Sequence, residues 1–94
     1  MNRILLVTHQ RKELEPLQSA LGRENFTVNV AEMSAKSVLE QAVKKIPDLA
    51  IFHFQTFPDA KGTSAHRVLK DEKELRDIPV LFLIPKEKTA QIDL

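Results

Sequence analysis

Two short runs of apolar residues constrain this chain more than any other feature of its sequence. Residues 49–52 read Leu-Ala-Ile-Phe shortly after Pro47, and residues 80–84 read Val-Leu-Phe-Leu-Ile between Pro79 and Pro85. Each run is too short for a core helix and has no polar residue on either face. This pattern is typical of a strand that is covered on both sides in a parallel sheet. The sequence therefore predicts an α/β fold.

Apolar spacing elsewhere in the chain predicts the other elements of such a fold. Residues 4–7 form a third short apolar run, and residues 26–30 alternate apolar and polar side chains, as in a strand at a sheet edge. Helical spacing predicts helices over residues 12–21, 35–45 and 63–73. Strands that alternate with connections of helix length imply parallel strands joined by right-handed crossovers.

Particular residues mark the ends of these helices. Gly22 suits the exit of the first helix, and Ser34 can cap the second. Residues 55–62 are predicted as a loop, after which Thr63 or Ser64 opens the third helix. The tail after the last strand is too short and polar to assign.

The composition excludes several classes of protein. The chain has 94 residues, a formal net charge of +1 and no cysteine, so we expect one small domain, residues 1–94, without disulfides or thiolate metal ligands. Because positive and negative side chains are interspersed, there is no basic patch for nucleic acid. No apolar run approaches the ~20 residues that span a bilayer. We expect a cytoplasmic protein, with residues 86–94 as its poorly determined tail.

Three segments carry a resemblance to a known family. Residues 1–7 read Met-Asn-Arg-Ile-Leu-Leu-Val, residues 46–52 read Ile-Pro-Asp-Leu-Ala-Ile-Phe, and residues 75–80 read Leu-Arg-Asp-Ile-Pro-Val, with Gly62 between the last two. Together they resemble the receiver domain of bacterial response regulators, over residues 2–85. The resemblance implies a flavodoxin-like α/β/α fold with strand order 2-1-3-4, in which the family's fifth strand and helix are missing. It also implies two-component signalling by phosphoryl transfer from a histidine kinase to an aspartate.

The chemical residues of that family are replaced in this chain. Its magnesium-binding acidic pair falls on Thr8 and His9, and its phosphoryl-accepting aspartate falls on His53. Its switch hydroxyl falls on Ile84, or on Pro85 if the register slips by one. Neither imidazole nor a threonine hydroxyl replaces carboxylate ligands of magnesium. We therefore expect a pseudo-receiver that is not an enzyme, needs no cofactor and acts by binding a protein partner in a bacterial signalling pathway.

His9 and His53 leave a second hypothesis open. Both follow predicted neighbouring strands, so both are expected at the same end of the sheet. With Gln55 or Asp59 they suit zinc, nickel or copper, which accept nitrogen ligands. The alternative function is thus a small-ligand or transition-metal sensor. The simpler interpretation of His53 is a polar residue that replaced an aspartate whose charge had lost its use.

The last predicted strand also indicates an interface. With strand order 2-1-3-4, residues 80–84 form an edge that is apolar on both faces and carries no charge to discourage pairing. We expect this edge to be covered by a second copy of the chain, by exchange of the tail, or by a segment of a longer parent protein; a homodimer is favoured. The expected contact residues are Val80, Phe82, Ile84 and Phe57.

Overall fold

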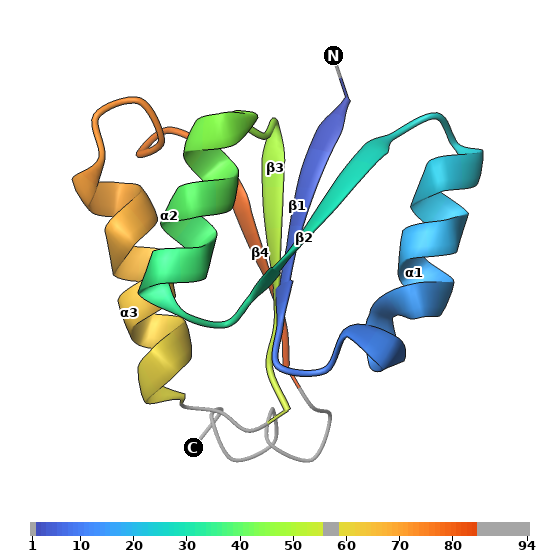
Figure 1. The fold of residues 1–94 in the computed structure, drawn as a ribbon, viewed down its shortest axis with the longest axis horizontal. Helices are drawn as coiled ribbons and strands as arrows, with labels where there is room; N and C mark the ends of the chain where they lie inside the picture. The colour runs from blue at the N-terminus through green and yellow to red at the C-terminus, as the bar shows by residue number, and fades with distance from the viewer. Residues whose placement is uncertain (1, 56–58, 85–94) are drawn as a thin grey trace.

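The computed structural model describes residues 2–55 and 59–84. Within them, strands and helices alternate in the order β1 (Arg3–Thr8), α1 (Arg11–Arg23), β2 (Thr27–Glu32), α2 (Ala35–Lys44), β3 (Leu49–His53), α3 (Ala60–Asp71) and β4 (Val80–Leu83). The strands are parallel and lie in the order β2-β1-β3-β4. One face of the sheet is covered by α1 and the other by α2 and α3 (Figure 1). The predicted fold and strand order are confirmed, while residues 86–94 lie outside the described part.

The strands of the sheet centre bury both of their faces. In β1, Leu5 and Val7 belong to the core cluster under α2 and α3, while Ile4 and Leu6 belong to the cluster under α1. All four side chains are buried. Because successive side chains of a strand point to opposite faces, an unbroken apolar run is what this two-sided core requires.

The start of α2 follows the sequence prediction. Ser34 has extended backbone angles, and its Oγ accepts a hydrogen bond from the amide of Ser37 at 3.2 Å. This bond satisfies one of the amide groups that a helix start leaves without a partner. The predicted cap is confirmed.

The exit of α1 differs from the prediction. The helix passes through Gly22 and ends at Arg23, and the residue with a positive φ is Asn25, at 70°. The amide of Asn25 donates to the carbonyl of Gly22, and the amide of Phe26 donates to the carbonyl of Leu21, each at 3.1 Å. These bonds close the helix around one left-handed residue, a conformation that asparagine tolerates. The prediction that Gly22 forms the exit was wrong, because the glycine lies inside the last turn.

The start of α3 also differs from the prediction, which opened the helix at Thr63 or Ser64. The helix begins at Ala60, and Asp59 is its cap. Oδ1 of Asp59 accepts hydrogen bonds from the backbone amides two and three residues later, at 2.9 and 3.4 Å. The prediction failed because a glycine in the first turn was interpreted as part of a loop, while the capping carboxylate before it was overlooked.

Both faces of β4 keep exposed apolar side chains in the described part of the chain, and the exposed fraction of Phe82 is 40%. Phe82 lies beside Phe52, on the face of α2 and α3. Leu81 lies beside Ile51, which belongs to the cluster under α1, so Leu81 and Leu83 point to the α1 face. Their exposed fractions are 52% and 39%. α1 packs against β2, at the opposite edge of the sheet.

Candidate functional site

The carboxyl ends of β1 and β3 bring together two of the predicted site residues. Thr8 and His53 are register partners in the sheet, and Oγ1 of Thr8 lies 3.0 Å from Nδ1 of His53. The Thr8 side chain is completely buried. Its Oγ1 also accepts a hydrogen bond from the amide of Gln10 at 3.0 Å and contacts the Gln10 carbonyl at 3.4 Å. The threonine thus links the end of β3 to the turn that leads into α1.

The second nitrogen of His53 faces an acidic side chain. Nε2 lies 3.8 Å from Oε2 of Glu13, in the first turn of α1. The exposed fractions of the His53 and Glu13 side chains are 19% and 54%. Sequence reasoning missed Glu13; the available signal was its place in the first turn of a helix that follows β1.

The order of Glu13, His53 and Thr8 is that of an acid, an imidazole and a hydroxyl in a hydrolytic triad, but this site does not support that chemistry. A nucleophile must reach its substrate, and the Thr8 side chain is completely buried. Its oxygen is already engaged by Gln10 and His53. The arrangement therefore joins elements of the fold.

His9 lies next to this pair but has a different partner. Its Nε2 contacts Oδ2 of Asp59 at 2.7 Å, so the carboxylate that caps α3 also binds the residue that follows β1. Burial alone would raise the pKa of Asp59, but the hydrogen bonds from His9 and from the amides of Gly62 and Lys61 outweigh it and lower the pKa below its usual value. Asp59 therefore stays ionised and ties α3 to the end of β1.

This link should make the stability of the domain depend on pH. Because the folded-state pKa of Asp59 is lowered, its contribution is fully present above the carboxyl's ordinary pKa and is lost as the pH falls through the folded value. Asp59→Asn keeps a capping oxygen but removes the negative charge, so it should lower the free energy of unfolding at pH 7 by about 0.5–1 kcal/mol and flatten its acid-side loss. Denaturant unfolding at several pH values measures both effects. Asp71→Asn, at the exposed far end of the same helix, is the control; an acid-side slope unchanged in Asp59→Asn would contradict the assignment.

The two histidines of the metal hypothesis therefore have separate partners. Among residues 2–55 and 59–84, no group of three or more histidine, cysteine, aspartate or glutamate side chains is arranged to hold a metal ion. Of the proposed additional ligands, Asp59 contacts His9. A site with nitrogen ligands from both His9 and His53 remains a prediction.

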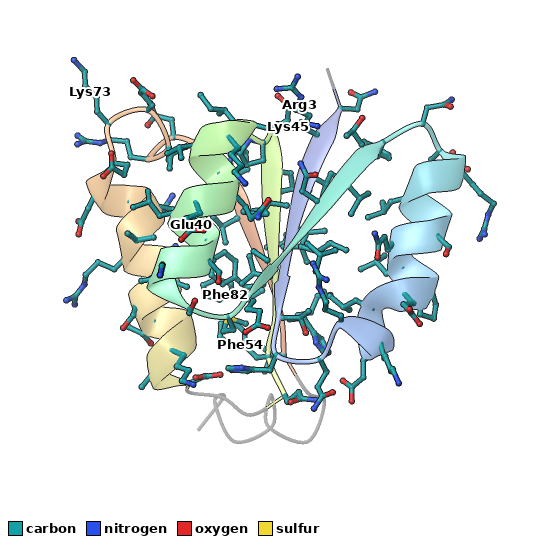
Figure 2. All side chains as sticks on the ribbon, in the orientation of Figure 1. Arg3, Glu40, Lys45, Phe54, Lys73 and Phe82 are labelled. Atoms are coloured by element: carbon teal, nitrogen blue, oxygen red, sulfur yellow. The ribbon has the colours of Figure 1, made fainter. Side chains whose placement is uncertain are left out.

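The other candidate residues lie toward β4. Ile84 is half-buried against the core, and Phe57 lies outside the described residues. Phe54, which follows β3, is buried, with an exposed fraction of 3%. It lies on the side of α2 and α3 together with Phe82 (Figure 2), and their ring centroids are 5.1 Å apart.

His66 of α3 completes this aromatic group. Its ring centroid lies 6.1 Å from that of Phe52 and 5.3 Å from that of Phe82, edge to face in both cases. Burial lowers the pKa of His66, and the positive charge of Lys70 lowers it further. The neutral imidazole is therefore part of the packing between α3 and β4.

Comparisons with known proteins agree with this architecture. No protein-family model and no curated protein matches the chain. A response regulator from Desulfuromonas acetoxidans is similar in structure, with a TM-score of 0.76 and 29% sequence identity, over 98% of this chain and 76% of that one.

Two further solved structures resemble the chain in fold. One is the N-terminal domain of a response regulator receiver protein from Methanoculleus marisnigri JR1, with a TM-score of 0.74 and 24% identity, over 99% of this chain and 77% of that one. The other is the signal receiver domain of a signal transduction histidine kinase from Syntrophus aciditrophicus, with a TM-score of 0.72 and 22% identity, over 98% and 70%. The described helices include none long and apolar enough to cross a membrane. In fold and strand order, the chain is similar to response regulator receiver domains.

Proposed function

We propose that this receiver domain signals by binding a protein partner and that it does not accept a phosphoryl group. The proposal includes a cytoplasmic location and the absence of enzymatic activity. One observation carries it: the imidazole of His53 makes a hydrogen bond with the buried hydroxyl of Thr8, at the positions where the family has carboxylates. Receiver domains are signalling modules, so the loss of this chemistry leaves protein binding as the activity to be explained.

The chemistry of magnesium supports the proposal. Mg²⁺ requires hard oxygen ligands in near-octahedral geometry. The Thr8 hydroxyl already makes hydrogen bonds with His53 and Gln10, and Nε2 of His9 makes a hydrogen bond with Asp59. Without the metal, the negative charge of a transferring phosphoryl group would go unneutralised.

Phosphorylation assays test this proposal directly. After incubation with acetyl phosphate and Mg²⁺, the intact mass of the chain should be unchanged, and beryllofluoride should leave its melting temperature unchanged. A phosphorylation-competent receiver domain treated in parallel is the positive control. His53→Asp should also stay unmodified, because it restores the acceptor without the metal ligands. The gain of a phosphoryl group by the unsubstituted chain would contradict the proposal.

The edge of β4 is the surface that we propose for partner binding. The carbonyls of Pro79 and Leu83 accept bonds from β3, so the backbone groups of Val80 and Phe82 point away from the sheet. No backbone partner for these outward groups occurs in the described part of the chain. Leu81 and Leu83 add exposed apolar area on the α1 face.

We propose that the partner at this edge is a second copy of the chain, paired through β4 and flanked by α3. Unpaired backbone groups beside apolar side chains favour strand pairing, and β4 carries no charge that opposes it. Burying about 400 Å² of apolar surface contributes about 10 kcal/mol before the cost of association, at about 25 cal/mol per Å².

A further inference from the structure

The opposite edge of the sheet contains a polar groove. β2 pairs with β1 only, and it runs between α1 on one side and α2 on the other (Figure 1). A cavity of about 370 Å³ lies along it. Its lining comes from three elements: Arg11, Glu15 and Gln18 of α1, Val28, Asn29 and Val30 of β2, and Gln41 of α2.

The floor of the groove is the free edge of the β2 backbone. The amide of Thr27 donates inward, to the carbonyl of Asn2. Because backbone direction alternates along a strand, the amides and carbonyls of Val28 and Val30 point outward. The guanidinium of Arg11 confirms this direction, since its Nη2 donates to the Val30 carbonyl at 3.2 Å. Within residues 2–55 and 59–84, the amides of Val28 and Val30 and the carbonyl of Val28 have no backbone hydrogen-bond partner, so they remain available to a ligand.

The walls of the groove suit a peptide. Side-chain amides of Gln18, Asn29 and Gln41 can each donate and accept hydrogen bonds, as peptide groups do. Along α1, the positive charge of Arg11 lies at the Val30 end, and residue 18 lies two turns further along the helix. Glu15 lies about one turn after Arg11, so the groove combines a backbone ladder with a cation at the Val30 end only.

We propose that this groove binds an extended segment of a protein partner as an additional, antiparallel strand, with one acidic residue of that segment opposite Val30. Antiparallel pairing fits because Val28 offers both its amide and its carbonyl, which one residue of an antiparallel strand engages together. A carboxylate opposite Val30 would form an ion pair with Arg11 and so draw the guanidinium away from the Val30 carbonyl. That carbonyl would then be free to accept a hydrogen bond from the added strand. This inference concerns the edge opposite β4 and does not depend on the function proposed above.

A second copy of β2 lacks the acidic residue that this site requires. If Val28 pairs with any residue of the copy's strand, Thr27–Glu32, the position opposite Val30 falls within residues 25–30. That segment reads Asn-Phe-Thr-Val-Asn-Val and contains no carboxylate. The charge at Arg11 thus favours a different polypeptide.

The acetylated and amidated peptide Thr-Thr-Asp-Thr-Thr-Thr is the probe for the first experiment. Its fifth residue, a threonine, would pair with Val28. The aspartate, at the third position, would then lie opposite Val30. In an NMR titration, the largest shifts should be those of the Val28 and Val30 amides, with slower hydrogen exchange at both. Replacing aspartate by asparagine should weaken binding about threefold to the unsubstituted chain and leave binding to Arg11→Gln unchanged. Shifts centred on β4, or no binding at millimolar peptide, would overturn the proposal.

Removal of single backbone donors provides the second experiment. Val28→Pro deletes an outward amide, a change that an edge strand tolerates, and should weaken binding about five- to tenfold. N-methylation of the peptide's fifth residue deletes the opposing donor and should have a similar effect with the chain unchanged, so the test survives if Val28→Pro does not fold. Equal affinity of the N-methylated peptide would exclude strand pairing. Protection of Val28 that rises with protein concentration alone would assign the groove to a second copy.

Discussion

Replacing Gly62 by alanine is expected to lower the free energy of unfolding by about 2 kcal/mol, or the melting temperature by roughly 10 °C. A Cβ on Gly62 would lie 2.2 Å from Cε1 of the Phe54 ring, a distance at which one of the two must move. Phe54 is buried, so its ring has little space to yield. Alanine favours helix by up to ~1 kcal/mol over glycine, which offsets part of the overpacking. Thermal and denaturant unfolding measure the result.

The chain provides a matched control and a rescue for this prediction. Gly22 also lies inside a helix, but a Cβ there would meet no atom within 4 Å. Gly22→Ala should therefore stabilise the domain by about 0.5–1 kcal/mol. Phe54→Leu should make Gly62→Ala less harmful, because it removes the ring atoms that the new methyl group would meet. Equal effects of the two glycine substitutions would show that helix propensity alone decides them.

The second large effect is expected at the edge of β4. If the proposed dimer forms there, Leu81→Lys should raise its dissociation constant about 30-fold. Half of the Leu81 surface is already exposed in the single chain, so about 1 kcal/mol of further burial is lost from each copy, roughly 2 kcal/mol in total. Two lysines brought together by the symmetry add repulsion. Sedimentation at several micromolar concentrations measures the change.

Two further substitutions separate association from folding. Val43→Lys removes a side chain of similar exposure, 54%, from α2 and should leave association unchanged. Phe82→Lys should weaken association and also destabilise the fold, because the Phe82 ring packs against Phe52, Phe54 and His66. A folded monomer for the unsubstituted chain at micromolar concentration would contradict the dimer and leave the edge to another polypeptide.

The sequence predicted the sheet better than the helix ends. The runs at residues 4–7 and 49–52 fixed two central strands because only burial on both faces accommodates unbroken apolar residues. Helix ends depend on single contacts that periodicity does not report. Asn25 closes the end of α1 and Asp59 caps the start of α3, while the more conspicuous Gly22 and Gly62 lie within helices.

The candidate site was predicted in position but not in its contacts. Strand order placed His9 and His53 at one end of neighbouring strands, whereas register makes Thr8 the residue that lies 3.0 Å from His53. The partners of His9 and of the second His53 nitrogen come from Asp59 and Glu13, whose side-chain directions follow from helix starts. Of these two starts, that of α1 was predicted within one residue, and that of α3 was predicted three or four residues late.

The hydroxyl of Thr8 carries a single proton, and this limits what its neighbours can do at the same time. When His53 is neutral with its proton on Nε2, the hydroxyl proton goes to Nδ1, and the Gln10 carbonyl receives nothing from Thr8. When the proton is on Nδ1 of His53, this nitrogen becomes a donor, and the hydroxyl proton turns to that carbonyl, 3.4 Å away. Oγ1 then accepts from both Gln10 and His53 while it donates to Gln10. The presence of a proton on one nitrogen of an imidazole on β3 thus determines how many hydrogen bonds hold the turn before α1.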